Sequence, residues 1–102
     1  MKKYDNYIYL TICELTINMV KGTNYSTYNA YCRGIANSIK DDVLSGYELR
    51  QMNYLNKMLT LYYGLSLNDT KKYIDAYFLE ELWVNYELSA RLTLDCFPLS
   101  FN

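Results

Sequence analysis

The side chains available for chemistry in this 102-residue chain include thirteen tyrosines and three cysteines but no histidine. Without histidine, the chain lacks the commonest general base near neutral pH and the commonest metal ligand. A serine or cysteine nucleophile would need a lysine or carboxylate as its base, and no such pair stands out. The neighbouring carboxylates Asp41–Asp42 and Glu80–Glu81 point about 100° apart on a helix, so neither pair converges on one metal ion. The sequence predicts a non-enzymatic protein with no catalytic residue, metal site or cofactor.

The cysteines indicate a reducing compartment. Cys13, Cys32 and Cys96 are odd in number, far apart and without a CxxC pair, which argues against a disulfide framework and a zinc site. No stretch approaches the ~20 apolar residues of a membrane span. Asp5 interrupts the short apolar run near the N-terminus, which argues against a signal peptide. We therefore expect a cytoplasmic location and no membrane contact.

Charge is balanced overall but unevenly distributed. Ten basic and eleven acidic side chains give a net charge of −1, so no general positive field attracts duplex DNA. Residues 1–72 carry nine basic and six acidic side chains, whereas residues 73–102 carry one basic and five acidic. This acidic third is either the solvated face of one helix or a surface for a basic partner. Glu80, Glu81 and Glu87 are the candidate contacts for such a partner.

Apolar residues recur at three- and four-residue spacing in four segments, which predicts four helices. Their approximate bounds are residues 4–21, 24–44, 46–63 and 66–94. A strand is the main alternative for the first segment, whose start is rich in Tyr and Ile. Short links between amphipathic helices predict an all-α fold, either a small four-helix bundle or an array of helical hairpins. Residues 1–102 are expected to form a single domain.

Glycine and serine mark the expected helix ends. Gly22 and Gly64 are expected to end helices in the left-handed conformation. Ser45 and Ser66 each precede an acidic residue by three positions, a spacing that predicts N-terminal caps. Gly34 lies inside the second helix, where it is unfavourable, and we expect it to mark a close helix crossing.

Helical geometry predicts which tyrosines of the second helix are buried. Tyr28 shares the core stripe with Cys32 and Val43, whereas helical geometry rotates Tyr25 and Tyr31 away from it. Exposed tyrosine rings suit protein interfaces, because a docked ring loses little side-chain entropy. We therefore predict that Tyr25 and Tyr31 contact another protein, either a target or a second copy in a homodimer. An AT-rich coding sequence is the alternative source of the tyrosine excess.

Residues 59–74 (LTLYYGLSLNDTKKYI) resemble the helix-turn-helix of small transcription regulators. They comprise an apolar helix, a glycine turn and a second helix with a polar start. The resemblance implies that Lys71 and Lys72 on the second helix would contact DNA. The segment departs from the pattern at Thr70, where an apolar core residue belongs, and at Asp69, which would lie near the phosphates.

The leading interpretation is a small helical module that works by binding another protein. A short, single-domain chain without a catalytic constellation is typical of accessory genes on phages and mobile elements. Such genes often encode inhibitors or adaptors of a host enzyme, including anti-defence factors of the anti-CRISPR kind. This is an analogy of type and not of motif. A nucleic-acid partner is expected only under the alternative of a DNA-binding regulator.

Overall fold

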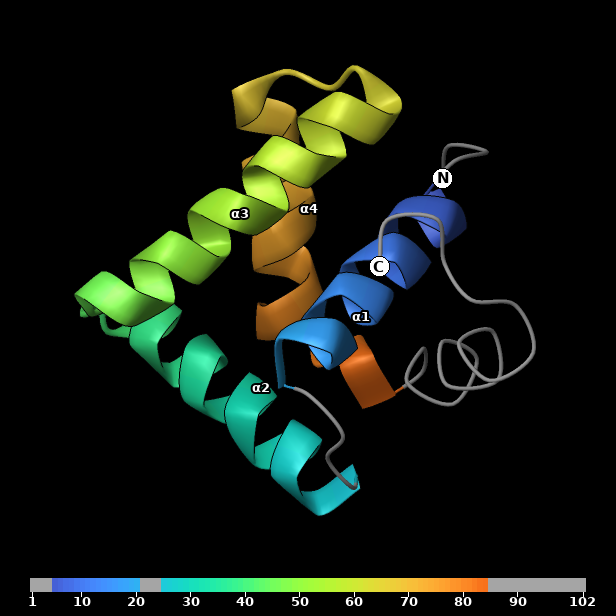
Figure 1. Ribbon diagram of the computed structural model, residues 1–102. Coiled ribbons are helices and arrows are strands. Elements are labelled where there is room, and N and C mark those ends of the chain that lie inside the picture. The colour runs from blue at the N-terminus through green and yellow to red at the C-terminus, as the bar shows by residue number, and fades with distance from the viewer. Residues whose placement is uncertain (1–4, 21–24, 85–102) are drawn as a thin grey trace.

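The computed structural model describes residues 5–20 and 25–84, which are almost wholly helical (Figure 1). Four helices follow one another: α1 (Asp5–Val20), α2 (Tyr25–Lys40), α3 (Gly46–Tyr63) and α4 (Leu67–Leu79). The described residues contain no strand. The expected all-α fold is confirmed, and the first segment is a helix. Gly22 lies outside the described residues.

The helices pack around α4. This helix contacts each of the other three, while α1 also contacts α2 and α3. In Figure 1, α2 and α3 diverge from their shared link, α1 lies in the opening between them, and α4 lies behind α3. Every helix therefore buries one face, as expected for a small bundle. The most deeply buried side chains of the core are Ile8, Ile12, Cys13, Leu15, Tyr28, Cys32, Ile35, Leu55, Leu59, Ile74, Tyr77, Phe78 and Trp83.

Two tyrosine hydroxyls meet inside this apolar core. The hydroxyl oxygens of Tyr28 and Tyr77 are 2.5 Å apart, and the sulfur of Cys13 lies 3.4 Å from the hydroxyl oxygen of Tyr28. Burial raises the pKa of both phenols, so both stay protonated at neutral pH. Tyr28 therefore occupies the core position that the sequence predicted, and the pair links α2 to α4 through a buried polar contact.

The caps around α3 and α4 are those that the sequence predicted. The Ser45 hydroxyl accepts the Glu48 amide at 3.4 Å, and the Glu48 carboxylate accepts the Ser45 amide at 3.0 Å. This reciprocal pair is a capping box. Gly64 ends α3 in the left-handed region at φ 66°. Ser66 begins α4 by accepting the Asp69 amide at 3.1 Å.

The end of α2 differs from the sequence prediction. The helix ends at Lys40, because Asp42 adopts φ 55° and reverses the chain. The Val43 amide donates to the Ser38 carbonyl at 3.0 Å, and the Asp42 amide donates to the Ile39 carbonyl at 3.2 Å. This pattern is a Schellman motif, with aspartate in the place that glycine usually takes. Val43 is therefore 62% exposed and does not extend the core stripe.

The fourth helix also ends before its expected boundary near residue 94. α4 ends at Leu79, and Glu81 adopts φ 54° in a second Schellman motif. Its two bonds run from the Leu82 amide to the Tyr77 carbonyl and from the Glu81 amide to the Phe78 carbonyl. The reversal returns the chain to the core, where Trp83, two residues after Glu81, is fully buried. Residues 85–102 lie outside the described part of the chain.

Gly34 does not mark a close helix crossing. It is exposed on α2, and a Cβ atom built there would meet no atom within 4 Å. The expectation of a crossing at this residue is therefore wrong. The glycine carries its conformational cost without a packing benefit, because a mid-helix glycine is less favourable than alanine.

Gly34→Ala is accordingly expected to raise the free energy of unfolding by about 0.5–1 kcal/mol. Urea unfolding followed by far-UV circular dichroism measures this change. Gly64→Ala is the matched control, because the positive φ there strains any residue with a Cβ atom and should lower stability instead. A neutral or destabilising Gly34→Ala would contradict the open environment described for Gly34.

Glu14 is a buried carboxyl on α1, only 5% exposed, and burial raises its pKa. A carboxyl with a raised folded-state pKa destabilises the fold where the carboxyl is ionised and does not where it is protonated. Glu14→Gln is therefore expected to raise the melting temperature at pH 7. The gain should shrink as the pH falls through the raised pKa of Glu14, and it should be lost by about pH 4, the ordinary range of a glutamate. Thermal unfolding of both proteins across this pH range tests the sign, and a pH-independent difference would contradict it.

Candidate functional site

A row of exposed side chains follows the outer face of α3. Tyr47, Tyr54 and Leu61 recur every seven residues and are 60%, 40% and 69% exposed. Seven residues bring a helix within about 20° of two full turns, so these side chains lie nearly in line. Arg50 and Lys57 stand between them at three- and four-residue spacing, and both are exposed. We call these five residues the α3 stripe.

The rest of α3 holds this stripe in place. The opposite face of the helix is buried in the core through Met52, Leu55 and Leu59. The Ser45 capping box fixes the start of the helix, and Gly64 fixes its end. A helix with one buried face and two capped ends presents its outer side chains at a fixed spacing. The stripe is therefore a preorganised surface.

The α3 stripe is positively charged. The Arg50 guanidinium lies 6.0 Å from the centre of the Tyr47 ring, within the range of a cation–π contact. Glu48, the acidic residue of α3, is turned away from the stripe. Its carboxylate accepts the Ser45 amide at 3.0 Å and the Ser38 hydroxyl at 3.1 Å, and these bonds lower its pKa. The stripe thus carries two cations and no carboxylate.

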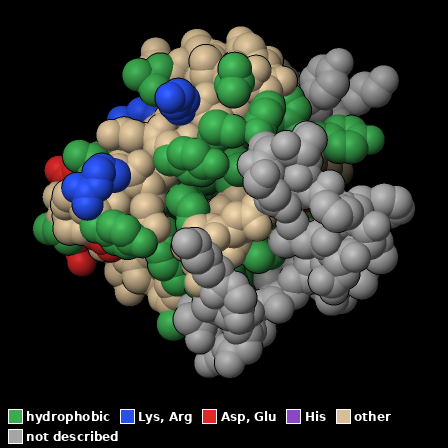
Figure 2. Space-filling view, viewed as in Figure 1, with side chains coloured by type: hydrophobic (Ala, Val, Ile, Leu, Met, Phe, Trp, Pro, Cys, Tyr) green, Lys and Arg blue, Asp and Glu red, His purple; other side chains and the backbone are tan. Residues whose placement is uncertain are grey.

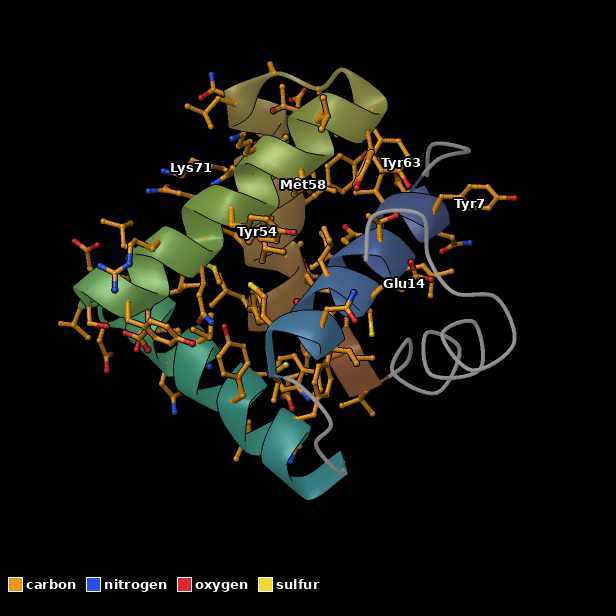
Figure 3. The ribbon with its side chains drawn as sticks, in the orientation of Figure 1. Tyr7, Glu14, Tyr54, Met58, Tyr63 and Lys71 are labelled. Atoms are coloured by element: carbon orange, nitrogen blue, oxygen red, sulfur yellow. The ribbon has the colours of Figure 1, made fainter. Side chains whose placement is uncertain are left out.

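A shallow groove lies beside the first half of the stripe, between α3 and the end of α1. Its volume is about 320 Å³, and Met19 and Gln51 line it together with residues of the stripe. Hydrophobic side chains gather over this side of the molecule (Figure 2). Tyr54 and Met58 project from the edge of α3 that faces α1 (Figure 3). Flexible methionines beside tyrosine rings are typical of surfaces that adapt to a bound partner.

A larger hollow of about 680 Å³ lies among the start of α1, the end of α3 and the start of α4. The rings of Tyr9 and Tyr73 pack edge to face in its wall, with their centres 5.5 Å apart. Half of its lining side chains are tyrosines, and the others include one carboxylate and one ammonium group. We call it the tyrosine cleft, and its lining includes Tyr9, Tyr62, Tyr63, Asp69, Lys72 and Tyr73.

Hydroxyl contacts fix two rings of the tyrosine cleft. Tyr73 donates to the Asp5 carboxylate at 2.6 Å, and this bond, aided by burial, raises the pKa of Tyr73 to about 12. The Tyr63 hydroxyl lies 2.6 Å from that of Thr11 and donates to the Tyr7 carbonyl at 3.2 Å. Tyr73 is therefore a neutral hydroxyl at physiological pH. These two rings serve as fixed walls of the cleft.

Two of the three acidic residues predicted to contact a partner, Glu80 and Glu81, lie outside the α3 stripe. Glu80 and Glu81 are exposed in the turn that follows α4. Glu81 forms an ion pair with Arg33 at 3.1 Å, and that guanidinium lies 5.9 Å from the centre of the Trp83 ring. Glu87 lies outside the described residues. The structure thus places one of the three in a contact within the chain, and partner contact by these residues stays a prediction.

The two tyrosines predicted to bind a partner both belong to α2. The side chain of Tyr25 lies outside the described part of the chain. Tyr31 is half-buried against the core, and its hydroxyl donates to the side-chain oxygen of Gln51. Gln51 in turn donates to the Tyr47 hydroxyl at 3.0 Å, so a polar relay links Tyr31 to the α3 stripe. Partner contact by either residue stays a prediction.

The two lysines of the helix-turn-helix resemblance diverge. Lys72 lines the tyrosine cleft with Asp69, whereas Lys71 lines a separate groove with Asp75. Each lysine therefore has a carboxylate nearby, which opposes contact with phosphate. Thr70 is fully buried, although it replaces an apolar residue of the pattern, because its hydroxyl lies 2.7 Å from the Asn56 side-chain oxygen. The hairpin forms, but it does not gather its lysines into one basic surface.

The α3 stripe was missed at the sequence level, although its signal is present. The three- and four-residue apolar spacing of this segment indicates the buried face of the helix, which includes Met52, Leu55 and Leu59. A search for a second periodic row on the same helix finds Tyr47, Tyr54 and Leu61 at seven-residue spacing. Such a second row on an already packed helix indicates a contact surface.

Three further findings concern metal sites, membrane spans and similarity to known proteins. Between residues 5 and 84, apart from 21–24, no three His, Cys, Asp or Glu side chains gather where they could hold a metal ion. None of the four helices is long and apolar enough to cross a membrane. Comparison with protein-family models, curated proteins and solved structures finds no match for the chain.

Proposed function

We propose that this chain is a protein-binding module that docks its partner on the α3 stripe. The observation that carries the proposal is the row formed by Tyr47, Tyr54 and Leu61, which stays exposed on a helix whose other face is buried. Large apolar side chains in line on a fixed helix gain free energy when a partner removes them from water. Tyrosine and arginine are also enriched among the residues that contribute most to interface affinity.

We further propose that binding itself is the activity, as in an inhibitor or adaptor that covers part of a larger enzyme. The exposed face of α3, on a helix whose opposite face is buried in the core, supports this role. The Tyr31–Gln51–Tyr47 relay would stiffen one end of the surface. Origin from a phage or another mobile element remains part of the proposal and is supported by the type of chain alone.

Replacing Tyr47, Tyr54 and Leu61 together by alanine is expected to weaken partner binding by about a hundredfold while leaving the fold intact. Truncating a hot-spot residue costs about 2 kcal/mol or more, and exposed side chains contribute little to stability. Affinity capture from lysate of the native host, with quantification of retained proteins, supplies the partner. Titration of that partner against both proteins then supplies the affinities.

The matched control replaces three exposed apolar residues outside the stripe. Tyr7, Tyr62 and Leu67 are 62%, 38% and 63% exposed and are the same residue types as those of the stripe, so alanines there remove a similar apolar area. This control variant should bind like the wild type. The proposal fails if the two triple variants lose the partner equally, or if the stripe variant binds normally with an unchanged melting temperature.

A further inference from the structure

The spacing of the α3 stripe matches the contact seam of a paired helix. Its five residues stand at intervals of three, four, three and four, which is the heptad pattern through which one helix packs along another. From Tyr47 to Leu61 the row extends about 21 Å, at 1.5 Å per residue. It therefore covers most of α3, whose bounds are Gly46–Tyr63. This length and regularity suit a straight helical partner.

The charge of the seam restricts the chemistry of that partner. Arg50 and Lys57 occupy the positions between the apolar side chains, and Glu48 is held on another side of the helix by Ser45 and Ser38. A helix lying along this seam brings its flanking residues within a few ångströms of both cations. Carboxylates at those flanks are attracted, whereas lysines there are repelled.

A second copy of the chain fits this seam poorly. Antiparallel pairing centred on Tyr54 places Arg50 of one copy beside Lys57 of the other. Parallel pairing places Arg50 beside the Arg50 of the second copy, and Lys57 beside its Lys57. Both arrangements bring like charges together with no carboxylate on the stripe to offset them. Like-charge contacts across an interface favour other partners.

Single-stranded nucleic acid also fits less well, although it favours aromatic rings and cations. Stacking requires an open ring face, and the Arg50 guanidinium already lies over the Tyr47 ring. Two cations spread along the seam also neutralise few phosphates. The regular apolar row, which ends in Leu61, is better matched by a partner helix that presents apolar side chains at heptad spacing.

We propose that the partner presents an acidic amphipathic helix, with apolar residues at heptad spacing and carboxylates at its flanks, which packs along the α3 stripe. This inference rests on the proposed function, because it names the chemistry of the partner at the same surface.

The test uses two synthetic four-heptad peptides with leucine at both seam positions. One carries glutamate at all flanking positions and the other carries lysine, so each repels its own copies and stays monomeric. Fluorescence anisotropy of labelled peptide is measured against the full chain at neutral pH. The acidic peptide is expected to bind with a Kd of roughly micromolar size. The basic peptide is expected to bind at least about tenfold more weakly.

Charge reversal provides the decisive variant. Arg50→Glu with Lys57→Glu is expected to reverse the preference, so that the basic peptide binds better. Lys40→Glu with Lys72→Glu makes the same change in net charge at exposed sites outside the stripe, and it should keep the preference for the acidic peptide. Circular dichroism melting of both variants verifies that the fold is retained.

Several results would overturn the acidic-helix proposal. The first is that the two peptides bind with equal affinity, and the second is that neither peptide binds. The third is that an oligothymidylate binds at the stripe with a higher affinity than the acidic peptide. Self-association of the wild type that is lost on charge reversal would assign the surface to a second copy instead. The proposed function fails separately, because it depends on loss of the captured partner in the triple-alanine variant of the stripe.

Discussion

Replacing Trp83 by alanine is expected to lower the free energy of unfolding by about 3–5 kcal/mol. The side chain is fully buried just after the turn that ends α4. Its indole N–H donates to the Asn29 side-chain oxygen at 2.9 Å, and its ring centre lies 6.5 Å from that of Phe78. Alanine would leave a large cavity and an amide oxygen without its donor. The loss is severe because domains of this size are stable by only about 5–15 kcal/mol in total.

Urea unfolding followed by far-UV circular dichroism measures this loss without depending on tryptophan fluorescence. Trp83→Phe retains an aromatic ring and should cost less than alanine, although it also removes the N–H donor. Val84→Ala is the neighbouring control, because Val84 is half-exposed and should change stability by no more than about 0.5 kcal/mol. A cost for Trp83→Ala below about 1 kcal/mol would mean that the segment after α4 does not dock as described.

The helix starts and one helix end could be predicted because short-range chemistry determines them. Ser45 and Ser66 satisfy amides within three residues of themselves, and Gly64 adopts a positive φ that other residues resist. Nothing distant is needed for these features. The periodic core positions were predictable for the same reason, since a helix repeats its buried face every three or four residues.

The ends of α2 and α4 were not predictable from local chemistry. Asp42 and Glu81 both adopt positive φ without being glycine, a conformation that costs a residue with a Cβ atom about 1–2 kcal/mol. Tertiary packing offsets that cost at Glu81, where the reversal lets Trp83 enter the core. Sequence periodicity alone favours a continued helix there, because it does not include the free energy of burying the indole.

The surface was harder to predict than the fold because tyrosine suits both environments. Tyr28 and Tyr77 are buried and bonded to each other, Tyr31 is half-buried, and Tyr47 is exposed, although all are the same residue type. A ring with a polar tip can satisfy its hydroxyl inside the core or in water. Only the arrangement of neighbouring helices decides between them, which is why the α3 stripe emerged from the structure and not from composition.

The hydroxyl pair of Tyr28 and Tyr77 is expected to show strong energetic coupling. Either Tyr28→Phe or Tyr77→Phe alone leaves the other hydroxyl buried without its main partner, at a cost of about 1–3 kcal/mol. The double variant removes both hydroxyls from an apolar site and should be much less destabilised than the two single changes added together. A double-mutant cycle of urea unfolding at pH 7, where both hydroxyls are protonated, measures this coupling.

The dependence of the free energy of unfolding on pH above about 10 tests the same pair through its ionisation. Because folding raises the pKa of both phenols, the unfolded chain ionises first. Stability is then fully present below about pH 10 and falls as the pH rises further. The double phenylalanine variant lacks these two groups and should lose less stability over that range than the wild type. Additive single-variant costs, together with an unchanged dependence of stability on alkaline pH, would show that the two hydroxyls do not act as a bonded pair.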